Sequence, residues 1–559
     1  MSIIKKMMVS INRLLSFIAV LSVFIGMSML SSCANSDNAG QSESSPFVKA
    51  DLVVYGKIFT AENNQIEEAF AVKDGKYIYV GDRKGAEAYI EEGKTEVIDW
   101  NFNRRGRTHL VMPGCGIGHA HYSMGFALQS VGTIVSRDDD VNTFLTKIVP
   151  ESVKNAKAKG LETVFGFGYD ALKFEKNMPT RQQLDAICSD IPIYFTDEGA
   201  HSGIFNTIAL VNAGIMTADG TVLKKEISGV EIEMGADGTP TGFLKEQAQT
   251  YVRSFLDNDN LFTVDIAKDN LVIIQEHLLA EGYTMYLDGW TTYFFNDNFY
   301  KAAQQMDEAG DMKFVIGTTY EIDSWMDVDA LLTKAANAKK YASIRVKTNW
   351  IKLFMDWSEE ELMDITHKAN EKGITMQVHV MDNKGVTRLV NAYINGGKDE
   401  MRNTLVHVGN VDDADYKRMA QHNIYVTAGL DVKDYPLKSF FDNGVNMSSH
   451  NDCLALGGSP DDPFSAMEIA VTGDDYAEEG KLWWTEECLT REQALTALTI
   501  NCAKQMFIEN ERGSIKKGKY ADFILLDKDV LTCPVNQIHK AKPYATYFEG
   551  KRVYVKSNE

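Results

Sequence analysis

The chain has 559 residues, 44% of them hydrophobic and 24% charged, which is an ordinary globular composition and long enough for two or more cores. Its formal net charge of −21 argues against a nucleic-acid partner, because such a surface repels phosphate backbones. The seven cysteines are scattered without a C-x-x-C spacing, so a disulfide framework is not indicated.

The N-terminus has the features of a targeting segment. Residues 1–13 carry three basic residues and no acid, and an apolar stretch follows over residues 14–30. The next residues, Leu30-Ser-Ser-Cys33, resemble a bacterial lipobox, in which cleavage leaves the cysteine as an acylated N-terminus. We therefore expect a signal peptide over 1–32, lipidation of Cys33, a polar tether over 33–48, and a lipid-anchored protein of the bacterial cell envelope, on the periplasmic side or in the outer membrane. The alternative, a transmembrane helix, needs a longer apolar run.

Both ends of the remaining chain are expected to form strands. Residues 51–60 alternate partly, and 69–81 read as two strands joined by the hairpin dipeptide Asp74-Gly75. Residues 518–526 and 545–555 have the same character. We predict one small composite β domain made from residues 49–112 and 511–559.

The middle of the chain, residues 113–510, alternates strands with helices. Strands are expected at 163–168, 191–196, 283–288, 313–318, 350–355, 375–379, 404–407, 424–427 and 453–456, and helices at 266–281, 359–372 and 385–394. Such alternation favours a parallel sheet, and this number of strands favours an α/β fold with a (β/α)8 TIM-type barrel. Catalytic residues of such a barrel lie at the carboxyl ends of its strands.

The tripeptide His119-Ala120-His121 follows a short apolar run and Pro113-Gly114. Side chains alternate along a strand, so residues two apart share a face, and two imidazoles at that spacing can bind one metal ion. Alone, the pair is weak evidence for a metal site, and two polar residues in a loop are the simpler interpretation.

Three further polar residues lie within or at the end of predicted strands. His379 and His407 each close an apolar run, and Lys352 interrupts another. In a parallel barrel these strand ends converge, so the set has the composition of a metal centre. A lysine carboxylated by CO2 presents a carbamate that can bridge two cations. Each histidine taken singly could instead be a core imidazole with satisfied hydrogen bonds.

With these motifs the chain resembles the amidohydrolase superfamily, and within it the amidohydrolase-3 group of YtcJ-like proteins. The resemblance covers nearly all of the chain after the predicted signal. Besides His119, His121, His379 and His407, it rests on the segments Gly56–Thr60, Ala71–Lys76, Val111–Gly114, Gly166–Asp170, Ala200–Asn206, Asp237–Glu246, Ile351–Asp356, Asp462–Thr472 and Gly513–Asp522.

The resemblance implies a metal-dependent hydrolase that acts on C–N bonds such as amides, formamides or cyclic amides of a small molecule. It implies one or two divalent ions, with zinc the first expectation, that polarise the carbonyl and lower the pKa of bound water. By position, His119 and His121 would bind the more buried ion, Lys352 would bridge, and His379 and His407 would bind the second. His201 would lie near the substrate.

The match to the family changes at the carboxylate expected after the last barrel strand. We expect that strand at 453–456, and the family position then falls on Gly458 or Ser459. Asp461, slightly downstream, is the predicted proton shuttle. Ile117 also stands where the family has an aspartate, two residues before the first histidine.

Two alternatives to an amide hydrolase stay open. One is a catalytically impaired surface lipoprotein that binds a ligand, and the other is a hydrolase of esters or lactones. A homo-oligomer is possible. The remaining histidines match no motif and are interpreted as surface or packing residues: His109, His277, His367, His422, His450 and His539.

Overall fold

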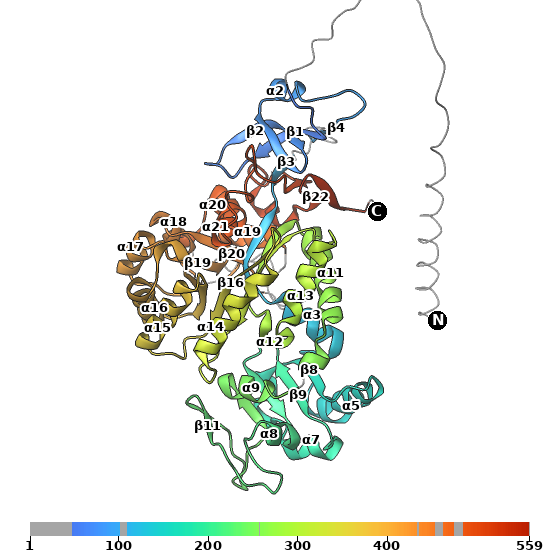
Figure 1. Cartoon of the computed structure of the whole chain (residues 1–559), viewed down its shortest axis with the longest axis vertical. Coiled ribbons are helices and arrows are strands. Elements are labelled where there is room, and N and C mark those ends of the chain that lie inside the picture. The colour runs from blue at the N-terminus through green and yellow to red at the C-terminus, as the bar shows by residue number, and fades with distance from the viewer. Residues whose placement is uncertain are drawn as a thin grey trace, which may run out of the picture. The chain divides into compact units, whose positions relative to one another are not determined.

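The computed structural model describes residues 47–100, 109–256, 258–432, 435–452, 462–474 and 485–557 (Figure 1). The predicted signal peptide, Cys33 and nearly all of the tether lie outside these ranges, as does Asp461. Among the described residues, no helix combines the length and apolar character needed to cross a membrane.

Eight parallel strands form the central sheet of the protein. In spatial order they are β6 (Cys115–Ala120), β14 (Tyr283–Asp288), β15 (Val315–Glu321), β16 (Val346–Leu353), β17 (Thr375–Val380), β18 (Thr404–His407), β19 (Tyr425–Gly429) and β20 (Met447–His450). The outer strands β20 and β6 contact each other. A Cβ placed on Gly118 of β6 would lie 2.4 Å from Ser448 Oγ of β20, so only glycine permits this close approach. The sheet is therefore a nearly closed barrel, and the predicted (β/α)8 fold is confirmed.

Helices between these strands cover the barrel. They are α11 (Val264–Ala280), α13 (Asn298–Glu308), α14 (Val328–Asn337), α15 (Glu359–Glu371), α16 (Asn383–Gly396), α17 (Asp413–Gln421) and α18 (Leu437–Asp442), followed by α19 (Pro463–Thr472), α20 (Arg491–Leu498) and α21 (Ile500–Gln505). Helix α15 shows why they form. Ser358 begins it with a capping box shared with Glu361, and its buried residues Leu362, Ile365 and Ala369 recur at helical spacing.

A second sheet draws strands from both ends of the described chain, so that blue and red segments lie together in Figure 1. It contains β1 (Leu52–Phe59), β2 (Ile66–Lys73), β3 (Lys76–Gly81), β4 (Glu96–Asp99), β5 (Leu110–Pro113), β21 (Phe523–Leu526), β22 (Pro543–Phe548) and β23 (Lys551–Val555). The junction is the antiparallel pairing of β5 with β21. Asp74 and Gly75, with φ of 48° and 77°, make the tight β2–β3 turn.

A third sheet is inserted between barrel strands β6 and β14. Its order is β13 (Phe243–Lys245), β10 (Ser202–Phe205), β9 (Ile193–Asp197), β8 (Val164–Tyr169) and β7 (Thr133–Ile134), with helices α3 (Tyr122–Val131), α5 (Val149–Ala158), α7 (Arg181–Ile187), α8 (Thr207–Asn212) and α9 (Glu246–Arg253) nearby in the chain. The sheet has its own apolar cluster around Phe144, Phe174 and Phe195. The segments predicted at 163–168 and 191–196 are therefore strands, but they belong to this insertion and not to the barrel.

Buried ion pairs of Arg512 connect the composite sheet with the segment that follows α21. Arg512 is 1% exposed and makes ion pairs with Asp522, which is also buried, and with Glu549. Replacing Arg512 by methionine leaves the Asp522 carboxylate buried without its partner, and we expect a loss of stability of about 3 kcal/mol or more. The loss is measured as a lowered urea midpoint.

The matched control is Arg83→Met, whose ion pair with Asp99 is about half exposed. An exposed pair of this kind contributes at most about 1 kcal/mol. Equal losses in the two variants would contradict a structural role for the buried pair.

Candidate metal centre

The carboxyl ends of the barrel strands bring the predicted polar residues together. His119 at the end of β6 lies 4.7 Å from His121, between ring centroids, and 5.6 Å from His407 of β18. His379 of β17 lies 4.4 Å from His407. Lys352 is in register with Gln377 on the neighbouring strand, and its Nζ is 4.3 Å from the centroid of the Phe354 ring. The side chains that sequence analysis selected from four strands therefore face one site.

Asp452, which sequence analysis did not select, supplies a carboxylate to this site. Its Oδ1 lies 3.2 Å from His121 Nε2 and 3.6 Å from His119 Nε2, and its Oδ2 lies 3.9 Å from His407 Nε2. One ligand atom from each of His119, His121 and Asp452 falls within 4.8 Å of the others. Two imidazoles and a carboxylate at this spacing are a donor set for a divalent metal ion.

Asp452 lies close to the end of the last described barrel strand. The eighth strand of the central sheet is Met447–His450, which the sequence analysis did not predict, and Asp452 follows it by two residues. The segment 453–461, with Asp461, lies outside the described residues. The signal that could have found the site is His450-Asn-Asp452, a polar triplet directly after a short strand.

His450 also lies beside the cluster, and its burial agrees with a packing residue and excludes a surface one. It is buried at the end of β20, with its ring 4.9 Å from that of His407 and 6.0 Å from that of His119. Neither ring nitrogen of His450 has a hydrogen-bond partner among the described residues. A buried imidazole without partners costs free energy unless another group satisfies it.

Burial favours the neutral form of four imidazoles at the site, those of His119, His379, His407 and His450. It lowers the pKa of His119 and His407 well below the usual value, that of His379 to about 3 and that of His450 to about 4. The neutral imidazole is the form that binds metals. Desolvation would raise the pKa of Asp452, but the surrounding imidazoles hold it well below its usual value, so the carboxylate is ionised.

The hydrogen bonds of His119 fix which nitrogen is available. Its Nδ1 lies 3.2 Å from Gln377 Oε1, an acceptor, so Nδ1 carries the proton. Gln377 is oriented by its amide Nε2, which donates to the backbone oxygen of Gly118. The Nε2 of His119, which faces Asp452, has no hydrogen-bond partner in the described part of the chain. In a metal-binding histidine, one ring nitrogen donates its proton to a neighbouring residue and the other presents its lone pair to the metal. His119, with Gln377 at Nδ1, has this arrangement.

Lys352 is nearly inaccessible, with 1% of its surface exposed. Burial lowers its pKa to about 8, although Asp452, Glu321 and Asp323 oppose this shift. Part of the Lys352 population is therefore a neutral amine at neutral pH, which is the form that can react with CO2 to give a carbamate.

His201 reaches the site from the inserted sheet. It lies between β9 and β10, is about half exposed, and its Nδ1 is 3.0 Å from Glu246 Oε2. This hydrogen bond raises the pKa of His201. His201 interacts electrostatically with Lys352 and His379, so the insertion places it near the cluster without making it part of the innermost set.

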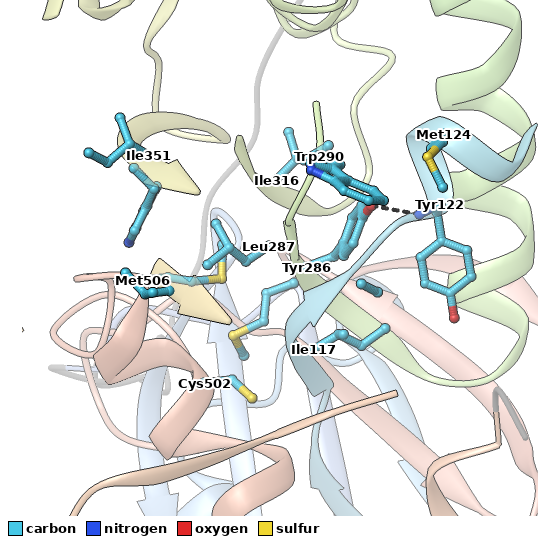
Figure 2. Close-up of a cluster of buried hydrophobic side chains, with 14 of the residues drawn as sticks. Ile117, Tyr122, Met124, Tyr286, Leu287, Trp290, Ile316, Ile351, Cys502 and Met506 are labelled. Atoms are coloured by element: carbon cyan, nitrogen blue, oxygen red, sulfur yellow. Dashed lines mark hydrogen bonds between the residues drawn. The ribbon is translucent and has the colours of Figure 1, made fainter. Parts of the chain in front are cut away.

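Buried apolar side chains fill the barrel, and aromatic side chains lie beside the imidazoles. Figure 2 shows Ile117, Leu287, Ile316 and Ile351 among the buried side chains of the barrel. Trp290, after β14, has its ring 4.8 Å from His121 and 5.5 Å from Phe354. These residues reduce the local dielectric constant, which strengthens electrostatic interactions at the site.

Comparison with known proteins agrees with this architecture. The model of the Amidohydrolase family matches residues 108–554, and the chain belongs to that family. It is 25% identical to the N-substituted formamide deformylase of Arthrobacter pascens over 555 residues, covering 89% of this chain and 97% of that protein. It is 23% identical to the putative amidohydrolase YtcJ of Bacillus subtilis (strain 168), covering 70% of this chain and 80% of that protein.

Among solved structures, an uncharacterized metal-dependent hydrolase from Pyrococcus horikoshii superimposes with a TM-score of 0.64 at 18% identity, covering 87% of this chain and 99% of that one. This likeness shows the shared fold. The family and the site together define an enzyme that hydrolyses carbon–nitrogen bonds other than peptide bonds, with a donor set suited to a divalent metal.

The contact between Gln377 and His119 leads to a prediction. The change Gln377→Leu removes the acceptor that holds the Nδ1 proton, and we expect metal affinity to fall by about 10- to 100-fold. The affinity is measured by competition with a chelator of known strength.

Gln182→Leu is the control, because Gln182 is exposed on α7 and lies outside the barrel. Gln377→Leu protein that folds normally and binds metal as tightly as the parent would show that Gln377 does not orient His119.

Proposed function

We propose that the protein hydrolyses an amide-type C–N bond of a small molecule by means of metal-activated water. The observation that carries the proposal is the Nε2 of His119, which has no hydrogen-bond partner among the described residues and is directed with His121 toward the carboxylate of Asp452. A bound divalent ion supplies Lewis acidity that polarises the carbonyl and lowers the pKa of water. Zinc is the ion we propose first, because it is commonly bound by imidazole together with carboxylate.

We assign the donors to two groups. His119, His121 and Asp452 hold the first ion. His379 and His407, whose rings are 4.4 Å apart, would hold a second ion, and Lys352, if carboxylated, would supply carbamate oxygens as further ligands. The lowered pKa of Lys352, about 8, supports carboxylation because it increases the reactive neutral fraction.

Asp452 is the carboxylate placed to accept the proton of the attacking water. Its carboxylate oxygens contact the imidazoles, and its side chain is 43% exposed. We therefore assign to Asp452 the role that sequence analysis gives to Asp461. Its low pKa keeps it in the basic form that proton transfer requires.

For the substrate we propose a small amide or N-substituted formamide. The support is the similarity to the Arthrobacter deformylase over nearly its whole length, together with the aromatic side chains of Trp290 and Phe354 beside the imidazoles. An apolar substituent on nitrogen would fit against these rings. His201, held by Glu246, is a candidate donor of a hydrogen bond to the substrate.

The test is a substrate panel with metal-loaded protein. The panel contains N-substituted formamides, simple amides, cyclic amides, esters and lactones. We expect hydrolysis of at least one amide-type compound, and Asp452→Asn should lower its kcat by about 10² or more when rates are expressed per bound metal.

Asp461→Asn is the matched control and should retain activity. Turnover of esters or lactones alone would contradict C–N specificity. Full metal loading without any turnover would favour a ligand-binding lipoprotein, and normal activity of Asp452→Asn would remove Asp452 from proton transfer.

We propose in addition that Cys33 anchors the protein to the cell envelope through a lipid. The support is the basic, apolar and Leu-Ser-Ser-Cys pattern of residues 1–33. Cells expressing the full chain should incorporate labelled palmitate into the protein, and Cys33→Ser should abolish incorporation. The control Cys488→Ser should leave labelling unchanged. Equal labelling of the Cys33→Ser protein would contradict the anchor.

A further inference from the structure

A cavity of about 650 Å³ lies away from the metal centre. Its walls come from the β1–β2 connection at Ala61–Asn64, from Phe441 of α18, from α20 and α21, and from residues 509–519. These segments belong to both ends of the described chain and to the helices of the barrel. A ligand in the cavity would therefore contact all three.

The cavity is at the opposite end of the barrel from the imidazoles. Helix α21, which contributes Lys504, packs under the amino ends of the strands. A Cβ on Gly116, near the start of β6, would lie 2.6 Å from Cys502 Cβ, and one on Gly317 of β15 would lie 3.4 Å from Met506. Because the metal-centre residues lie at the carboxyl ends, the two sites are separate.

Positive charge gathers around the cavity although the whole protein is strongly acidic. Lys504, Lys516, Lys517 and Lys519 line it, against Glu62 and Glu509. Both carboxylates are already paired. Glu62 accepts from Lys516 at 3.0 Å and Lys519 at 3.1 Å, and Glu509 is bound at 2.7 Å by Arg402, a residue outside the lining.

Two of the lysines have no carboxylate partner in the part of the chain that the structure describes. Within the described ranges, neither Lys504 nor Lys517 has an ion pair within 4 Å, and Lys504 Nζ donates only to the amide oxygen of Asn501, at 3.3 Å. Burial lowers the pKa of Lys504, so its charge is incompletely compensated. Neutral polar side chains complete the lining: Asn63, Asn64, Gln493, Thr496 and Asn510.

We propose that this cavity binds a small organic anion bearing a phosphate or carboxylate group, with Lys504 and Lys517 as its ionic partners. Ammonium groups and amide N–H groups are the donors that recognise such anions. The volume admits a molecule larger than a simple inorganic ion. Since the walls come from three parts of the fold, binding also stabilises their packing.

The probe is 3-phosphoglycerate, which carries both groups, titrated into the full-length, metal-loaded protein by calorimetry. Glycerol 3-phosphate and glycerate, each with one of the groups, distinguish the two chemistries. We expect saturable binding of 3-phosphoglycerate at one site. The double variant Lys504→Gln/Lys517→Gln should weaken binding at least about tenfold, which corresponds to about 1.4 kcal/mol.

The matched control is Lys225→Gln/Lys372→Gln, which removes the same charge from exposed positions outside the cavity lining. It should bind as the parent does, and both double variants should show the parent's unfolding temperature without ligand. Absence of saturable binding of all three anions would overturn the proposal, and so would equal affinities in the two double variants. Loss of binding in His121→Ala with retention in the lysine variant would place the anion at the metal centre and also overturn it.

Discussion

The contact between the Asp452 carboxylate and the imidazoles of His119 and His121 connects the first strand of the barrel with the last. His119 closes the first strand, β6, and Asp452 follows the last strand, β20. The two come within 3.6 Å only because these strands lie side by side, with Gly118 of β6 against Ser448 of β20. Closure of the barrel therefore also brings the metal-binding side chains together. Any change that separates β6 from β20 also separates His119 from Asp452.

The residues of the site lower the stability of the fold. Lys352 and four imidazoles are withdrawn from water, and several of their nitrogens have no partner among the described residues. The backbone contributes as well, since His407, Val408 and Asp452 have φ values of 79°, 62° and 48°. A positive φ is unusual for a β-branched residue such as Val408. Each residue other than glycine in the left-handed region costs on the order of 1–3 kcal/mol of folding free energy. The large apolar core of the barrel offsets these terms.

Much of the barrel could be predicted because its strands are apolar runs between turns. Residues 283–288 and 404–407 match β14 and β18 in full, and His119, His121, Lys352, His379 and His407 were selected from strand ends that do converge. Strand β20 was not recognised. Its sequence, Met-Ser-Ser-His, has no β-branched or aromatic residue, because small side chains are needed where Ser448 meets Gly118 and Gln505. Because this strand was missed, the carboxylate was sought after residues 453–456, and Asp452 was not selected.

The local sequence pattern could not show that the strands inserted between β6 and β14 form a separate sheet. Strands β8 and β9 have the same apolar, parallel character as barrel strands, and only their long-range pairing places them in another sheet. The Glu246 partner of His201 depends on that pairing as well, since β10 and β13 bring together residues 45 positions apart.

The most direct test of the metal centre is a metal analysis of the purified protein combined with anomalous scattering from its crystals. We predict at least one divalent ion per chain, with an anomalous peak between His119 Nε2, His121 and the Asp452 carboxylate, and loss of that ion in His121→Ala but not in His367→Ala. Protein that takes up no zinc or manganese, or an ion bound away from these three side chains, would contradict it.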